Sequence, residues 1–272
     1  MQDARQKGQA EYFGFLADIG VTKHVGGLKA TDEMLGLFHI DASSYILDVG
    51  CGIGATPCYL VKRYGCRVVG IDIEPKMIER ATVLAQHKGV AASCEFRVAD
   101  AQDLPFEDDR FDVVLVESVS TFLPDRPKAF REYVRVTKPG GYVGMNETTW
   151  VERGPGAMAF MNSIGADALV KEEWVALLQE AGLQDIVANA YPPNLREEAR
   201  GRLKYYGTGE MLKVVGRTLV TLLKPKSRGV IKTAMATING TRLDPGEMFS
   251  FNEVVGPRTK DAGYRKAKAY YG

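Results

Sequence analysis

Residues 46–56 read ILDVGCGIGAT, a hydrophobic run that ends in a glycine-rich turn. The run predicts a buried strand, and glycines in the turn let the backbone reverse tightly and let a ligand come close. From Gly50 the turn matches G-x-G-x-x-A, a pattern of dinucleotide-binding loops. From Asp48 it matches D-x-G-x-G-x-G, which suggests a different ligand. The glycines alone do not separate these two interpretations.

Strand and helix patterns alternate on both sides of this turn. The strands expected at 67–71 and 111–116 are almost continuously apolar (RVVGI and FDVVLV), as a sheet covered on both faces requires. We therefore predict an α/β fold, a doubly wound, mostly parallel Rossmann-like sheet with helices on both faces and helical cap segments. The other strands are expected at 45–49, 94–98, 141–146 and 184–190, and helices at 55–64, 75–87, 127–137, 170–181 and 195–236, with helical residues 11–40 preceding them.

Composition restricts the kinds of partner. The 272 residues carry 35 Lys and Arg against 34 Asp and Glu, a net charge of +1 that gives no argument for nucleic acid or an anionic membrane. No apolar run approaches the roughly 20 residues of a membrane span, and the first residues lack the pattern of a signal peptide. The four cysteines have no metal-ligand spacing. These features favour reduced thiols, a cytoplasmic location and no metal site.

Three aspartates choose between the two interpretations of the turn. Asp48, Asp72 and Asp100 each stand at the end of an expected strand, where ligands of such sheets bind. A carboxylate at position 48 repels a pyrophosphate and suits a cationic amino group. Asp72 suits a ribose diol, and Asp100 an adenine amino group. The set fits S-adenosylmethionine, which has no phosphate, better than NAD.

The sequence resembles the class I S-adenosylmethionine-dependent methyltransferases that act on small molecules. The matching segments are ILDVGCGIGAT, VVGIDIEPKMIERA, FRVADAQDLPFEDDRFDVVLVES and VRVTKPGGYVGMNE, between residues 45 and 147. The resemblance implies that the glycine loop lines the methionine part, with the ribose and adenine held by the second and third strand ends and the methyl group near the fourth. The residues implied are Asp48, Gly50, Cys51, Gly52, Gly54, Asp72, Ile73, Met77, Asp100, Ala101, Glu117 and Ser118.

The segment HVGGLKAT, residues 24–31, is similar to one in methyltransferases acting on phosphoethanolamine, where it closes over the cofactor with a preceding tyrosine. This similarity implies cofactor contacts for Tyr12, Gly27 and Thr31. A histidine that assists catalysis in that subgroup aligns with Phe122, so an amine acceptor does not follow from the resemblance.

We expect methyl transfer to a small-molecule acceptor, with O, N and C left open as the methylated atom. An NAD-dependent oxidoreductase and a non-catalytic cofactor-binding module are the alternatives. Candidate catalytic residues are His24, Glu117 and Glu147, because each could accept a proton from the acceptor. The expected assembly is a monomer or homodimer.

Residues 238–267 do not resemble a methyltransferase but the opening of a VanW-type domain. We therefore expect a methyltransferase domain over 1–236, with lid helices at 1–40, a cofactor-binding core at 41–190 and a helical cap at 191–236. We expect residues 237–272 to form a VanW-like tail that is not an independent domain. The tail is expected to lie at the periphery, and the alternative is that EMFSFNEVV forms a strand that completes the sheet.

Overall fold

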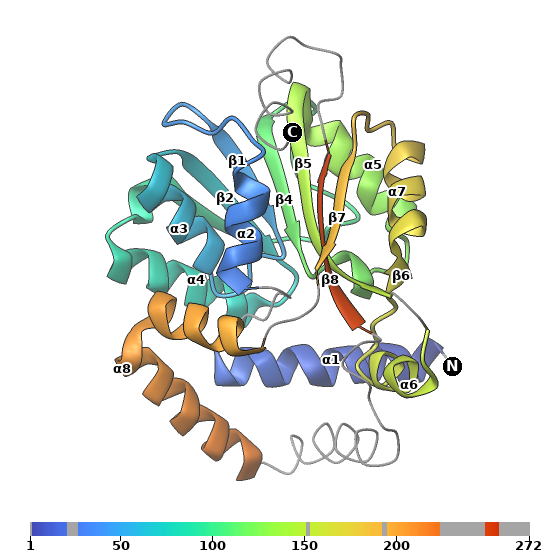
Figure 1. Ribbon diagram of the computed structural model, residues 1–272. Coiled ribbons are helices and arrows are strands. Elements are labelled where there is room, and N and C mark those ends of the chain that lie inside the picture. The colour runs from blue at the N-terminus through green and yellow to red at the C-terminus, as the bar shows by residue number, and fades with distance from the viewer. Residues whose placement is uncertain (1, 21–26, 151–152, 192–194, 224–247, 256–272) are drawn as a thin grey trace.

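The computed structural model describes residues 2–20, 27–150, 153–191, 195–223 and 248–255, and Figure 1 shows their arrangement around one central sheet. The sheet has eight strands in the order β3-β2-β1-β4-β5-β8-β7, and β6 pairs with β5 beyond this path. The predicted doubly wound α/β fold with a mostly parallel sheet is confirmed.

The parallel part of the sheet carries the predicted alternation of strands and helices. Its strands are β1 (Tyr45–Val49), β2 (Arg67–Asp72), β3 (Cys94–Val98), β4 (Phe111–Glu117), β5 (Thr137–Trp150) and the short β6 (Leu169–Val170). The helices between them are α3 (Ala55–Tyr64), α4 (Pro75–Lys88) and α5 (Arg126–Val136), followed by α6 (Pro155–Ser163) and α7 (Lys171–Glu180). Two short 3₁₀ turns lie at Ala91–Ser93 and Ser120–Phe122.

Alternate residues of the strands face two separate cores. Leu47 and Val116 pack with side chains of α5 and α7, among them Trp174, which is fully buried. Ile46 and Leu115 face the other way, onto α3, α4 and the N-terminal helix α2 (Gly27–Leu35). This alternation is the reason that the strands read as continuous apolar runs.

The antiparallel part of the sheet contains a strand from the VanW-like tail. β8 (Met248–Val255) lies between β5 and β7 (Val187–Tyr191) and pairs antiparallel with both. The expectation of a peripheral tail is therefore wrong for these residues, and the alternative of a strand that completes the sheet is the arrangement observed. The pairing satisfies the backbone groups of β5 on the side away from β4.

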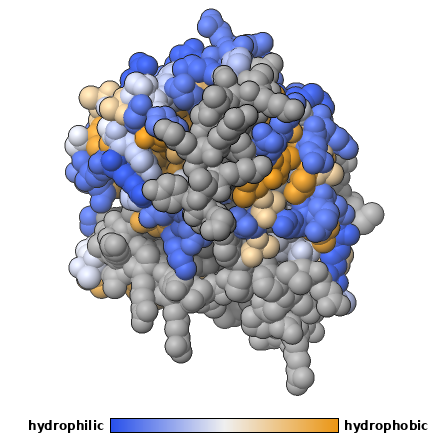
Figure 2. Space-filling view, turned by 45° about the horizontal axis from the view of Figure 1, so that its top comes forward, coloured by the Kyte–Doolittle hydropathy of each residue, from blue (hydrophilic) through white to orange (hydrophobic). Residues whose placement is uncertain are grey.

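Two helices complete the described part of the chain. The N-terminal helix α1 (Gln2–Ile19) passes beneath the sheet in Figure 1, and α8 (Leu195–Leu223) packs against α1 and α2. None of the described helices combines the length and the hydrophobicity needed to cross a bilayer. Among the coloured residues of Figure 2, most of the surface is hydrophilic, and hydrophobic side chains gather in limited patches.

Candidate active site

A cavity of about 310 Å³ opens at the carboxyl ends of β1, β2 and β4, where the glycine loop joins β1 to α3. The loop is held against the neighbouring strand: the Cys51 N–H donates to the Ile71 carbonyl (2.8 Å), and the Gly52 N–H donates to Asp72 Oδ2 (2.9 Å). The loop therefore presents its backbone to the cavity in a fixed conformation.

The three aspartates predicted from the sequence all line this cavity. Besides the Gly52 bond, Asp72 accepts the Glu74 N–H at 2.9 Å, and Asp100 accepts the N–H of Gln102 at 2.9 Å. These backbone bonds fix the two carboxylates and leave lone pairs for further donors, because each carboxylate offers about four acceptor positions.

Asp48 differs from the other two acids. Its side chain is 2% exposed, and Oδ2 has no hydrogen-bond partner among the residues that the structure describes. Burial raises the pKa of Asp48 well above that of an ordinary carboxyl, and nearby Glu117 and Asp72 raise it further. A buried acceptor without a partner, next to other acids, is suited to a cationic donor that enters the cavity.

Glu117, at the end of β4, also lines the cavity and connects two helices to the sheet. The Thr31 hydroxyl donates to its Oε1 (2.7 Å), and the Thr56 hydroxyl donates to its Oε2 (3.0 Å). Thr31 thus supports the site through Glu117, and it is not among the described residues that line the cavity.

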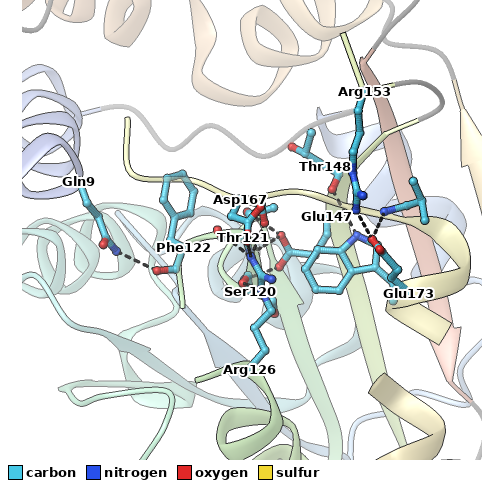
Figure 3. A network of polar contacts seen from close by, with 12 residues as sticks. Gln9, Ser120, Thr121, Phe122, Arg126, Glu147, Thr148, Arg153, Asp167 and Glu173 are labelled. Carbon is cyan, nitrogen blue, oxygen red and sulfur yellow. Dashed lines mark hydrogen bonds and ion pairs between the residues drawn. The ribbon is translucent and has the colours of Figure 1, made fainter. Parts of the chain in front are cut away.

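Glu147 lies on β5, one residue after the Asn146 that pairs with Glu117, and it is fully buried. Its carboxylate accepts backbone N–H groups of Val119 (2.9 Å), Ser120 (2.6 Å) and Thr121 (3.4 Å), and the Thr121 hydroxyl donates to it (3.0 Å). Figure 3 shows the bonds from Ser120 and Thr121 converging on Glu147. Burial raises the pKa of Glu147 and the bonds oppose this rise. Glu147 fixes the turn after β4 and does not line the cavity among the described residues.

Helix α1 closes one side of the cavity with Gln9, Phe13 and Leu16, and the Gln9 amide donates to the Phe122 carbonyl (3.3 Å). Tyr12 does not line the cavity in the described structure. Its ring stacks on Phe122 with 6.0 Å between the ring centroids.

Some of the remaining predicted residues line the cavity, and others do not. Gly27 and Gly54 are absent from the described lining; a side chain at Gly54 would meet Ala81 Cβ at 2.8 Å, so this glycine allows α3 and α4 to approach. His24 lies outside the described residues. The predicted residues that do line the cavity are Asp48, Gly50, Cys51, Gly52, Asp72, Ile73, Met77, Asp100, Ala101, Glu117 and Ser118.

Several lining residues were not predicted as cofactor contacts. Gln9, Phe13 and Leu16 recur at helical spacing and so share one face of α1, a signal that could have identified them. Thr56 follows the glycine loop directly, but its bond to Glu117 joins residues 61 positions apart, which no local pattern reveals.

Comparison with known proteins agrees with this geometry. A family model described as a methyltransferase domain matches residues 47–145, and one described as VanW like protein matches residues 227–272. The chain is 32% identical to tocopherol O-methyltransferase of Arabidopsis thaliana, over 71% of this chain and 62% of that protein, so it spans slightly less than two thirds of that relative.

A second relative is covered over more of its length. The chain is 31% identical to 27-O-demethylrifamycin SV methyltransferase of Amycolatopsis mediterranei, over 65% of this chain and 67% of that protein. Among solved structures, a phosphoethanolamine N-methyltransferase 2 of Haemonchus contortus, in complex with phosphomonomethylethanolamine and S-adenosylhomocysteine, superposes with a TM-score of 0.69. It is 18% identical, over 90% of this chain and 56% of that one, which shows a shared fold.

Proposed function

Because this chain belongs to the S-adenosylmethionine-dependent methyltransferases, we propose that it transfers the methyl group of this cofactor to a small-molecule acceptor. The observation that carries the proposal is the unpartnered, buried Oδ2 of Asp48 beside the glycine loop. This atom fits the ammonium group of the cofactor's methionine part, since a buried carboxylate needs a charged donor.

The other parts of the cofactor match the rest of the cavity. We propose that Gly50, Cys51 and Gly52 border the methionine chain and that Asp72, held by two backbone bonds, accepts the ribose hydroxyls. Ile73 and Met77 would contact the adenine ring, whose edge would be read by Asp100 and the Ala101 N–H. Ser118 and Glu117 would lie near the methyl group.

The charge of the cavity argues against the oxidoreductase alternative. Asp48, Asp72 and Asp100 line one small space together with Glu117, and no Lys or Arg is among its described lining residues. A dinucleotide would place its pyrophosphate at the loop beside these acids, and like charges repel strongly where water is excluded. A non-catalytic module would bind the cofactor and transfer no methyl group.

The bound cofactor supplies an electrophilic methyl group, and the protein's own residues orient the acceptor and exclude water. Positioning of this kind contributes several kcal/mol to catalysis, on the order of 7 to 11 in favourable cases. Glu117 is our proposed proton acceptor, because it lines the cavity near the proposed methyl position. Glu147 is a positioning residue, since its carboxylate is occupied by the turn after β4. His24 remains a proposed base.

The acceptor side of the cavity is apolar. Phe13 of α1 and Phe122, Leu123 and Pro124 of the turn after β4 line it. We propose an acceptor with a hydrophobic body, which this lining supports better than a small charged amine. The named substrates of the two relatives, tocopherol and demethylrifamycin, are consistent with such a body.

The remaining expectations also stand as proposals. These are a methyltransferase domain over 1–236 with its lid, core and cap, to whose sheet β8 adds a strand, a cytoplasmic location, a monomer or homodimer, and no binding of nucleic acid. The free thiols of Cys51, Cys58, Cys66 and Cys94 support the cytoplasmic location.

Calorimetry with S-adenosylmethionine, S-adenosylhomocysteine and NADH tests the proposal. We expect both sulfur ligands to bind and NADH not to bind. Asp48 holds a proton more readily than usual in the free protein, whereas a cation favours its ionised form. Binding should therefore release protons, and affinity should rise as the pH rises through the elevated pKa of Asp48. Titrations in buffers of different ionisation enthalpy measure this release.

Asp48→Asn should lose most of this pH dependence and weaken binding by about 2 kcal/mol or more. Glu180→Gln, on the exposed side of α7, is the matched control and should bind like the wild type. Absence of binding to both sulfur ligands would contradict the proposal. A screen of acceptors for release of S-adenosylhomocysteine then separates an enzyme from a cofactor-binding module.

A further inference from the structure

The second half of α8, residues 211–223, exposes its hydrophobic side chains to solvent. Leu212 (73% exposed), Leu219 (60%) and Leu223 (72%) lie with Val215 and Val220 on the outer side of the helix. Spacings of three and four residues place most of them on one face. We name these five residues the apolar stripe. They form the majority of the large hydrophobic side chains that are exposed in the described structure.

The opposite face of this helix is more polar than the stripe. Val214 and Thr221 are buried, and Arg217 approaches Gly20 at the end of α1. An ordinary surface helix buries its apolar face and exposes its polar one. Helix α8 packs against α1 and α2, and Val214 and Thr221 of the mixed face are buried. The leucines of the apolar stripe remain exposed and are available to contact a binding partner.

Charge around the stripe indicates which surface that is. From Met211 to Leu243 the sequence contains seven Lys and Arg residues and no Asp or Glu. The whole chain has a net charge of only +1, so the rest of the chain is net acidic. Lys213 is exposed on the described helix, whereas Arg217 lies on its packed face. Lys224 and Lys226 follow within three residues of Leu223 in the sequence. The net charge of the whole chain therefore does not reveal that residues 211–243 are strongly basic.

We propose that α8 docks the protein on an anionic lipid surface, with the apolar stripe at the level of the acyl chains, and that the positive charge of the segment 211–243 favours anionic headgroups. Helices with an apolar face and basic flanks lie in this way at membrane interfaces, where each cation near the surface adds about 1 kcal/mol. A second copy of the chain is a less suitable occupant, because it would bring two basic segments together. The proposal does not depend on the reaction at the active site.

Flotation of the full chain with vesicles tests the docking. The wild type should bind vesicles that contain phosphatidylglycerol more tightly than vesicles of phosphatidylcholine alone, and added salt should weaken this binding. Leu219→Asp should reduce the binding at least about tenfold, since it places a charge where an apolar side chain would be buried. Because Leu219 is exposed, circular dichroism and thermal unfolding of the free protein should not change.

Val83→Asp is the matched control, because Val83 is also half exposed (50%) but lies on α4, away from the stripe. It should bind vesicles like the wild type, and the conservative variant Leu219→Met should keep the binding. The proposal is overturned if the wild type ignores anionic vesicles or if Leu219→Asp binds them as well as the wild type does. It is also overturned if Leu219→Asp only dissociates a dimer in sedimentation experiments while no vesicle binding is seen.

Discussion

At the residue scale, Gly50 and Gly89 share one backbone conformation but differ in the space around them. Gly50 in the loop after β1 and Gly89 at the end of α4 have φ values of 70° and 69°, in the left-handed region that L side chains rarely adopt. A methyl group on Gly50 would lie 2.2 Å from Val119 Cγ2, whereas one on Gly89 would meet nothing within 4 Å. Gly50 is therefore required by both conformation and space, and Gly89 by conformation alone.

We expect Gly50→Ala to destabilise the protein by more than Gly89→Ala, which should cost about 1 kcal/mol from backbone strain. Only Gly50→Ala should also lose S-adenosylmethionine binding, because relief of the Val119 contact moves the loop or the turn after β4, and both line the cavity. Denaturant unfolding and calorimetry of the two variants measure the effects. Equal losses of stability would show that the loop and the turn separate without cost.

The site residues that could be predicted from the sequence are those at the ends of parallel strands. Asp48, Asp72 and Asp100 could be placed together because each ends a parallel strand, and the carboxyl ends of such strands share one edge of the sheet. The roles of Glu117 and Glu147 could not be separated in advance. Glu117 ends β4, and Glu147 follows Asn146, the β5 partner of Glu117. Only the conformation of the turn at 118–121 directs one carboxylate to the cavity and the other to backbone N–H groups.

At the scale of elements, β8 shows the limit of reading a chain by resemblance. Strand and helix bounds from 45 to 136 were predictable to within a residue or two, because apolar runs and glycine or proline boundaries mark them locally. The place of β8 depends on pairing with β5 and β7, far away in the sequence, whereas the resemblance of this segment to a VanW-type domain favoured a peripheral position. The alternation in EMFSFNEVV was the available signal.

We expect Asn252→Pro to destabilise the protein by about 3 kcal/mol, because proline removes a backbone donor in a strand that is paired on both sides. Asn252→Ala is the matched control, since it keeps the N–H group, and it should cost much less. Thermal unfolding compares the two variants with the wild type. If both variants unfold like the wild type, β8 does not belong to the sheet in solution.

At the scale of the whole molecule, α1 contacts both the cavity and α8. Its Phe13 and Leu16 line the cavity, Ala17 packs with Ile53 of the glycine loop, and its end contacts α8. The buried hydrophobic residues of the described part of α1 are Ala17 and Ile19. A helix so lightly buried is expected to open locally more readily than the sheet does. Entry to the site is therefore expected past α1, on the side where α8 lies.

We expect S-adenosylhomocysteine to slow the hydrogen exchange of α1 amides from residue 9 to residue 17, because the ligand fills the space behind this helix. Amides of α7, which packs on the other face of the sheet with α5, should exchange at an unchanged rate and serve as the internal control. Mass spectrometry of peptic peptides with and without ligand gives both rates. Protection of the glycine loop without protection of α1 would show that the helix is not the cover of the site.

The position of β8 in the sheet also sets an order for folding during synthesis. Among the described strands, β7 pairs with β8 alone, yet α8 separates these two strands in the sequence. While the ribosome is making α8, β5 presents one unpaired edge and β7 has no neighbour, so the nascent chain carries an open edge of the kind that promotes aggregation. Slow elongation through this interval prolongs that exposure, and the late, non-local closure of the sheet makes folding slower than its parallel half alone would be.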